Sequence, residues 1–400
     1  MNALKVVSDF AKPLISDNAF SMLIFFVTSR CNSVCRTCFY WDSLNQEGDL
    51  SFEEIQTISA TMPRFRDLWL SGGEPTMREE LVDIIDLFCK NNGVSTVRLP
   101  TNGLLTGRIE NIVDSVFEQN PNITFHINLA LDGYGETHDQ IRGVPGNFEK
   151  ALNTLRALTP RRDRYPGFRL FVNSVVCKEN YEELIDLGHF IRDHFDVDGH
   201  YFQIIRGNAP DLDLKDVPME NLRVIYENAM KLHRHYLNKT REKPDGVPQK
   251  VFELFYLGTY LFTYETQFNN ADHNELWKMP CLAGTTSAAL DFDGKLRICE
   301  LRDPVGNLRD YDCDFNKLWE SKIMRDEVKQ MHEDQCDCTH ICFLYNSLKS
   351  SSRVKFWDIP KSYFKFKKSN ERFNWLRVSR NERTPKVAES ESAVVESLSS

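Results

Sequence analysis

The sequence has no uninterrupted apolar run of the length that a transmembrane helix needs, about 18 residues, so we expect no membrane-spanning segment. Its N-terminus also lacks the basic start and the long apolar stretch of a signal peptide, which predicts a cytoplasmic protein. Disulfide bonds are rare in that compartment, so the 11 cysteines favour metal binding. The formal net charge of −9 argues against a nucleic-acid-binding surface.

What the sequence does contain is a regular alternation of β-rich and helical patterns from residue 22 to residue 207. The β-rich runs are Met22–Thr28, Asp67–Ser71, Ser95–Pro100, Thr124–Leu131, Phe168–Val176 and His200–Ile205. The helical patterns between them include Phe52–Ala60, Arg78–Asn91, Arg108–Glu118, Phe148–Leu158 and Tyr181–Phe195. This alternation predicts an α/β fold with a parallel sheet and helices outside it. Six units are too few for a closed eight-stranded barrel, so we predict a partial (β/α)6 barrel with its active site at the C-terminal strand ends.

Three cysteines, Cys31, Cys35 and Cys38, follow the first predicted strand in a C-x3-C-x2-C pattern. Such a loop can bind three corners of a cubane iron–sulfur cluster, and no fourth Cys or His lies nearby in the sequence. Structural zinc sites and ferredoxin-type clusters normally have four protein ligands. Three ligands leave an open position at the metal, which indicates chemistry there. The alternatives are buried structural cysteines or an incomplete zinc site.

Other polar or glycine-rich segments follow the later strands. The second strand ends in Gly72, Gly73, Glu74 and Pro75, where two glycines let the backbone approach a ligand closely. Asn102 follows the third strand, Asn128 lies in the fourth, and Arg142 comes shortly after it. An Arg suits a carboxylate, because its planar group donates two hydrogen bonds. Ordinary turns and, for Arg142, a surface ion pair are the competing interpretations.

Taken together, the cysteine pattern and the Gly-Gly-Glu-Pro segment resemble the radical SAM superfamily. The resemblance implies that the three cysteines hold a [4Fe-4S] cluster whose open iron binds S-adenosylmethionine (SAM). It also implies reductive cleavage of SAM to a 5′-deoxyadenosyl radical, which abstracts hydrogen from a substrate. The cofactor-binding residues would then be Gly72, Gly73, Glu74, Pro75, Asn102, Asn128 and Arg142. Two positions depart from the family pattern: Asn128 replaces a more usual Ser, and Thr37 replaces an aromatic residue, with Phe39 and Tyr40 following.

A second cysteine group comes late in the chain and consists of Cys281, Cys299, Cys336, Cys338 and Cys342. Asp293-Gly294, between the first two, predicts a β-hairpin. The group is similar to the auxiliary-cluster domain called SPASM, or its shortened form, twitch. This resemblance implies one auxiliary [4Fe-4S] cluster held by Cys281, Cys299 and two of the last three cysteines. Thiolate spacing discriminates metals poorly, so a zinc site remains the alternative.

The predicted domains are a lead-in (1–21), a radical SAM core (22–207), a mostly helical connector (208–275), a SPASM/twitch-like domain (276–345), a basic aromatic tail (346–386) and a disordered end (387–400). From Leu348 to Lys386 the tail carries 12 Lys or Arg residues against three acidic ones. Its aromatic residues can pack back on the barrel, which is our preferred interpretation. The alternative is docking on an anionic membrane surface or a partner.

The expected function is therefore a radical SAM oxidoreductase that modifies a peptide or small metabolite. Its expected partners are that substrate and an electron donor such as flavodoxin or ferredoxin. Two other classes remain open: a zinc-stabilised binding module, and an iron–sulfur electron carrier without SAM chemistry. Cys313 is expected to be free, while Cys89 and Cys177 are expected to be small buried hydrophobic residues.

Overall fold

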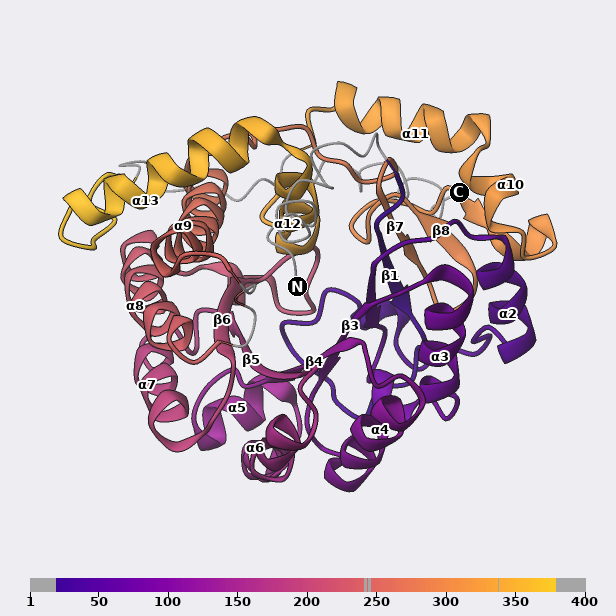
Figure 1. Ribbon diagram of the computed structural model, residues 1–400, viewed down its shortest axis with the longest axis horizontal. Helices are drawn as coiled ribbons and strands as arrows, with labels where there is room; N and C mark the ends of the chain where they lie inside the picture. The colour runs from indigo at the N-terminus through magenta and orange to yellow at the C-terminus, as the bar shows by residue number, and fades with distance from the viewer. Residues whose placement is uncertain (1–18, 241–242, 244–245, 337, 379–400) are drawn as a thin grey trace, which may run out of the picture.

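A computed structural model describes residues 19–240, 243, 246–336 and 338–378. Its core is a nine-stranded sheet in the order β6-β5-β4-β3-β2-β1-β7-β8-β9 (Figure 1). Strands β1 to β6 are parallel, each beside the next one along the chain. Their bounds are β1 Met22–Phe26, β2 Asp67–Ser71, β3 Thr96–Thr101, β4 Thr124–Ala130, β5 Phe168–Val176 and β6 Gly199–Ile204. The predicted α/β fold with a partial parallel barrel is confirmed.

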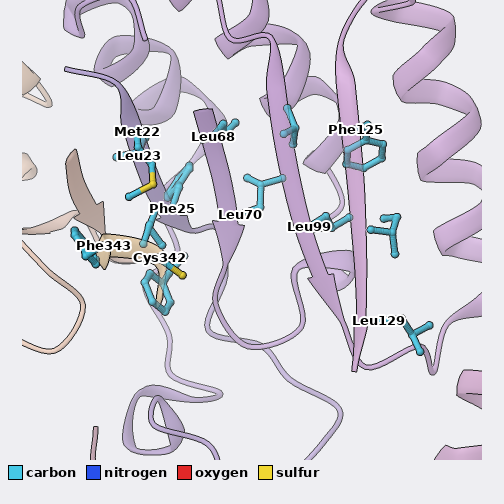
Figure 2. Close-up of a cluster of buried hydrophobic side chains, with 14 of the residues drawn as sticks. Met22, Leu23, Phe25, Leu68, Leu70, Leu99, Phe125, Leu129, Cys342 and Phe343 are labelled. Carbon is cyan, nitrogen blue, oxygen red and sulfur yellow. The ribbon is translucent and has the colours of Figure 1, made fainter. Parts of the chain in front are cut away.

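Helices cover the outer face of this sheet (Figure 1). They are α2 Phe52–Thr61, α3 Leu81–Asn92, α4 Thr106–Gln119, α5 Gly135–Arg142, α6 Asn147–Arg164 and α7 Leu184–His194. Helix α2 begins at a capping box in which Ser51 and Glu54 each bind the other's backbone N–H group. Helix α3 ends at Gly93, whose positive φ of 69° favours glycine. Alternate strand residues, such as Leu68, Leu70 and Leu99 (Figure 2), are buried beneath this helical layer.

The opposite face of the sheet is more polar and more accessible. Because side chains alternate along a strand, Trp69 and Arg98 lie on the face opposite to Leu68, Leu70 and Leu99. Both are partly exposed, and the Arg98 guanidinium lies 4.8 Å from the centre of the Trp69 ring. Phe171 and Tyr201 stack on the neighbouring strands, with 5.1 Å between ring centres. The concave side of the barrel is therefore lined by polar and aromatic groups.

The late hairpin joins the same sheet. Strand β7 (Ser287–Leu290) pairs in parallel with β1, and β8 (Lys295–Arg297) and β9 (Gly306–Asn307) continue the sheet in antiparallel fashion. Gly294 lies in the turn before β8 with φ of 90°, as the Asp-Gly pair predicted. The helices α10 Phe315–Trp319 and α11 Lys322–Glu333 follow. The domain boundaries proposed above remain predictions.

Four helices complete the described chain: α8 Met219–Leu237, α9 Gln249–His273, α12 Ile341–Ser350 and α13 Ile359–Lys368. Cys342 and Phe343 of α12 lie close to Phe25 of β1 (Figure 2). Farther along α12, Asn346 donates a hydrogen bond of 2.9 Å to Thr286, just before β7. Short helical turns are η1 Trp41–Ser43, η2 Pro75–Met77, η3 Leu212–Lys215, η4 Leu308–Tyr311 and the π-helical η5 Val354–Asp358.

The described part of the basic aromatic tail packs against α9. Ser362 of α13 donates a hydrogen bond of 2.8 Å to Glu265 of α9, and Ile359 lies against Gly258. The predicted disordered end 387–400 and nearly all of the lead-in 1–21 lie outside the described residues. Within the described chain, no helix is both long enough and apolar enough to cross a membrane.

Candidate functional site

The loop that carries Cys31, Cys35 and Cys38 contacts the ends of the neighbouring strands. Asn102, directly after β3, donates hydrogen bonds from its side-chain amide to Asn32 (2.7 Å) and Ser33 (2.9 Å). These two acceptors lie between the first and second cysteines of the loop. The structure thus brings the predicted Asn102 against the cysteine loop, as expected for parallel strands whose carboxyl ends share one edge.

The Gly72-Gly73 turn presses against the segment that leads into the cysteine loop. The Gly73 N–H group donates to Thr28 O at 2.9 Å, and the Glu74 N–H group donates to Arg30 O at 2.8 Å. A Cβ atom at Gly72 would lie 2.3 Å from Thr28 O, and one at Gly73 would lie 2.1 Å from Arg30 O. Any side chain at either position would displace the backbone, so both glycines are needed for this close approach.

The carboxylate of Glu74 joins the ends of β2 and β3. It is 2% exposed and accepts hydrogen bonds from the Thr76 hydroxyl (2.6 Å), the Thr101 hydroxyl (2.8 Å) and the Asn102 N–H group (2.8 Å). Burial raises its pKa, although these hydrogen bonds act in the opposite direction. The neighbouring Pro75 is buried and begins η2. Glu74 therefore holds the two strand ends together, whichever ligand the turn binds.

Arg142 lies at the end of α5 and next to the cysteine loop. Its Nη1 atom is 3.2 Å from the Oδ2 atom of Asp132, which is fully buried. Burial opposes the charged form of Arg142, but Cys35 and Asp132 raise its pKa above the ordinary value. The buried Nε atom of Arg142 has no hydrogen-bond partner among the described residues. A fixed positive charge with a free donor beside the cysteines suits an anionic group such as a carboxylate.

Helix α5 is also attached directly to the cysteine loop. The Arg36 N–H group donates to Ile141 O at 2.9 Å, and a Cβ atom at Gly143 would lie 2.5 Å from the Val34 side chain. Gly143 has φ of 66° and ends the helix, so it permits this contact where another residue would be strained. This arrangement keeps Arg142 close to the loop.

The three loop thiols are partly exposed and influence one another. Burial, together with the nearby Cys35, raises the pKa of Cys31 to about 12 and that of Cys38 to about 11. Without a metal, these thiols therefore hold their protons at neutral pH, and metal binding must displace them. Three thiols on one loop, with the unpartnered Arg142 donor beside them, fit the donor set of a cluster with an open iron.

Within the residues that the structure describes, no three Cys, His, Asp or Glu side chains are grouped closely enough to bind one metal ion. A structural zinc site needs four such ligands around a single point. The cysteines of an iron–sulfur cluster need not converge on a single point, because each of them binds a different iron atom.

Asn128 differs in position from the other predicted cofactor-binding residues. It lies within β4, where it is in register with Pro100 of β3 and Phe171 of β5. It is partly exposed, on a strand whose neighbouring residues Ile127 and Leu129 are fully buried. The structure thus places Asn128 inside the sheet, before the strand end.

Four of the five late cysteines influence one another. Burial, with a smaller contribution from Cys336, raises the pKa of Cys281 to about 11. Burial also raises the pKa of Cys299, and both Cys338 and Cys281 add to that shift. Burial raises the pKa of Cys342 to about 12, while Arg206 opposes the shift from 3.9 Å away; Arg206 and Glu300 act on Cys299 as well.

Between the two cysteine groups lies a buried ionic network that the sequence did not reveal. Arg206, after β6, and His340, before α12, lie 2.8 Å and 2.7 Å from the same carboxylate oxygen of Glu300. Burial raises the pKa of Glu300, but Arg206 and His340 lower it more, to about 2. The Arg206 guanidinium also lies 4.3 Å from the centre of the Phe39 ring, one residue after Cys38. The network therefore connects the first cysteine loop to the second group.

A signal for this network existed in the sequence, although it is weak. Glu300 directly follows Cys299, and His340 lies between Cys338 and Cys342. Acidic and imidazole groups next to metal-binding residues often form hydrogen bonds that orient the metal ligands. Of the remaining cysteines, Cys177 is buried as expected and Cys89 is only partly buried. Cys313 is buried and not bonded to another cysteine.

Comparison with known proteins agrees with this geometry. Residues 25–191 match the model of the radical SAM superfamily. The chain is 28% identical over 288 residues to a probable GTP 3′,8-cyclase of Methanocaldococcus jannaschii, an alignment that covers 69% of this chain and 84% of that protein. It is 24% identical over 345 residues to an AdoMet-dependent heme synthase of Oleidesulfovibrio alaskensis, covering 81% of this chain and 80% of that protein.

Solved structures share the fold at lower sequence identity. The structure of anSMEcpe with bound AdoMet and a Cp18Cys peptide gives a TM-score of 0.55 at 16% identity, covering 90% of this chain and 99% of that chain. Streptococcus suis SuiB bound to S-adenosylmethionine gives a TM-score of 0.50 at 17% identity, covering 80% of this chain and 70% of that chain. The likeness extends beyond residues 25–191 in both cases.

Proposed function

We propose that this chain, whose residues 25–191 match the model of the radical SAM superfamily, acts as a member of that superfamily, binds SAM at Cys31, Cys35 and Cys38 and modifies a substrate oxidatively. When bound there, a [4Fe-4S] cluster supplies the electron that cleaves SAM to a 5′-deoxyadenosyl radical. The observation that carries the proposal is the meeting of Asn102, Arg142 and the Gly72-Gly73 turn at the cysteine loop.

In this proposal the polypeptide binds and orients the cofactor. The unpartnered Nε–H group of Arg142 donates to the SAM carboxylate, while Asp132 holds the guanidinium in place from the other side. The turn at Gly72 and Gly73 provides backbone groups close to the loop, with Glu74 fixing its shape. Asn128 belongs to the same site as a group that reaches the cofactor from β4.

We place the auxiliary cluster at Cys281, Cys299, Cys336 and Cys338, because these four thiols influence one another. In this assignment Cys342 is not a ligand of the cluster, and its thiol lies beside Arg206. The ionic network of Arg206 and Glu300 holds this group against the first cysteine loop. An auxiliary cluster held by these residues would supply an electron acceptor for the substrate, and the electron donor in this proposal is a flavodoxin or ferredoxin.

The proposed substrate is a peptide or a small metabolite that lies over the concave face of the barrel. Trp69, Arg98 and Tyr201 on that face are accessible and combine aromatic with polar character. Among relatives, SuiB is seen bound to its precursor peptide, whereas the heme synthase and the GTP cyclase are named for small molecules. Both substrate classes are therefore retained. Action in the cytoplasm is part of the same proposal.

Anaerobic reconstitution with iron and sulfide tests this assignment. We expect the protein to bind about eight irons in two clusters and to form 5′-deoxyadenosine from SAM and dithionite. Elemental analysis that finds zinc and no acid-labile sulfide would instead support a zinc-stabilised binding module. Reversible cluster reduction without SAM binding would support an electron carrier.

Paired variants test the ligand assignment of the auxiliary site. Cys299→Ala should lower the iron content from about eight toward about four per chain, because the auxiliary cluster loses one of its four proposed thiolate ligands. Cys342→Ala removes a thiol of similar burial from the same region and should keep about eight irons. Iron and sulfide determination on both purified variants checks this. An equal loss of iron in Cys342→Ala would contradict the assignment.

A further inference from the structure

One helical face of the tail is exposed although it carries large aromatic side chains. Residues 352–368 form a continuous helix through η5 and α13. Its buried side consists of Val354, Asp358, Ile359, Ser362 and Phe366. On the other side Trp357 is 67% exposed, Phe364 is 54% exposed and Phe356 is 51% exposed. The helix therefore packs one side against the protein, while its solvent-facing side carries large aromatic residues as well as polar ones.

Basic and aromatic residues alternate along that outer face. Five residues, each three or four positions after the previous one, make up this alternation, and we call them the basic aromatic stripe. They are Arg353, Trp357, Lys361, Phe364 and Lys368. Residues at this spacing lie on one side of a helix. All five are exposed. The stripe lies along a helix at the periphery of the molecule, over α9 (Figure 1).

The charges of the stripe remain available to a partner. Neither Lys361 nor Lys368 is paired with a carboxylate of the described residues, and the Arg353 side chain, 3.6 Å from Asp358, is still 72% exposed. Between Arg353 and Lys368 the chain has six basic residues, and its only acid, Asp358, is buried. Strong positive charge on this helix contrasts with the net charge of −9 of the whole chain.

We propose that the basic aromatic stripe is a docking surface for an anionic lipid bilayer. Lys and Arg are attracted to acidic headgroups, while Trp and Phe side chains enter the interfacial layer beside them. A helix that lies flat on the surface would present all five stripe residues at once. The acidic remainder of the protein would be repelled from the same surface, so charge also orients the molecule. The enzyme would thus act beside a membrane without spanning it.

Cosedimentation of the iron-loaded enzyme with vesicles tests this proposal. We expect the protein to bind vesicles of phosphatidylcholine and phosphatidylserine at least about tenfold more tightly than vesicles of phosphatidylcholine alone, at low salt. The double variant K361E/K368E should lose about tenfold or more of this binding, and W357S/F364S should lose a similar share. The circular dichroism spectrum and the melting temperature should stay unchanged, because the substituted side chains are exposed.

The matched control changes the same charges on a different helix. Lys322 and Lys329 of α11 are 80% and 74% exposed, so K322E/K329E alters the net charge equally at another place. That variant should bind anionic vesicles nearly as well as the wild type. Equal loss in this control, equal binding to both vesicle types, or no binding at all would overturn the proposal. The 5′-deoxyadenosine assay is independent of this test and is expected to be the same in all these variants.

Discussion

Alanine in place of Cys35 is expected to lower 5′-deoxyadenosine formation by more than about 100-fold. Replacing a group that only supports a metal ligand typically costs about 10–100-fold, so loss of a ligand itself should cost more. The effect is expected because Cys35 is one of the three proposed ligands of the cluster and lies between Cys31 and Cys38 in the loop. The iron content should fall by about four per chain at the same time. Liquid chromatography of anaerobic reactions with SAM and dithionite measures the nucleoside.

Cys89→Ala is the matched control for this variant. Cys89 lies on α3, on the outer side of the sheet, and is partly buried like the loop cysteines. The Cys89→Ala variant removes one thiol outside the proposed site, so iron content and nucleoside formation should both match those of the wild type. If Cys35→Ala formed as much 5′-deoxyadenosine as Cys89→Ala, the loop could not be the site of cleavage.

Arg142→Ala is expected to weaken SAM binding by more than about tenfold and to destabilise the protein by about 3–5 kcal/mol. The variant leaves the fully buried carboxylate of Asp132 without its cationic partner, which accounts for the loss of stability. The loss of affinity follows because the donor proposed for the SAM carboxylate is removed. Isothermal titration of the iron-loaded protein with SAM measures the affinity, and denaturant unfolding measures the stability.

The chain contains a second buried pair that separates these two effects. Arg162 Nη2 lies 2.8 Å from Asp198 Oδ1, and Asp198 directly precedes β6, at the opposite end of the strands from Arg142. Arg162→Ala should therefore destabilise the protein by a comparable amount and leave SAM binding unchanged in the folded fraction. Should Arg162→Ala weaken SAM binding as much as Arg142→Ala does, the effect at Arg142 would be one of stability alone.

The six barrel strands could be predicted because each is a short apolar run between turn or helix signals. Phe168–Val176 has the same bounds in the sequence prediction and in the structure. The meeting of Asn102 with the cysteine loop also followed, since the ends of parallel strands share one edge of a sheet. Helix α5 was missed because its eight residues, Gly135 to Arg142, are mostly polar. The signal for this helix in the sequence is Gly143, which ends the helix in a left-handed conformation.

Long-range pairing could not be predicted in the same way. Strand β7 lies beside β1, although Ser21 and Thr286, which are hydrogen-bonded near the start of both strands, are 265 residues apart. Nothing local in the hairpin sequence specifies which strand it joins. The Arg206, Glu300 and His340 network depends on that pairing, because the hairpin that carries Glu300 must first lie beside the barrel. The sequence therefore revealed the two cysteine groups but not their connection.

Electron paramagnetic resonance tests the central claim most directly, because it reports whether SAM reaches an iron of the first cysteine loop. The iron-loaded protein is reduced with dithionite, and its spectrum is recorded before and after SAM is added. The proposed open iron predicts that SAM changes the signal of one cluster and that this change is missing in Cys35→Ala. A spectrum of the fully loaded wild-type protein that is identical with and without saturating SAM would contradict it.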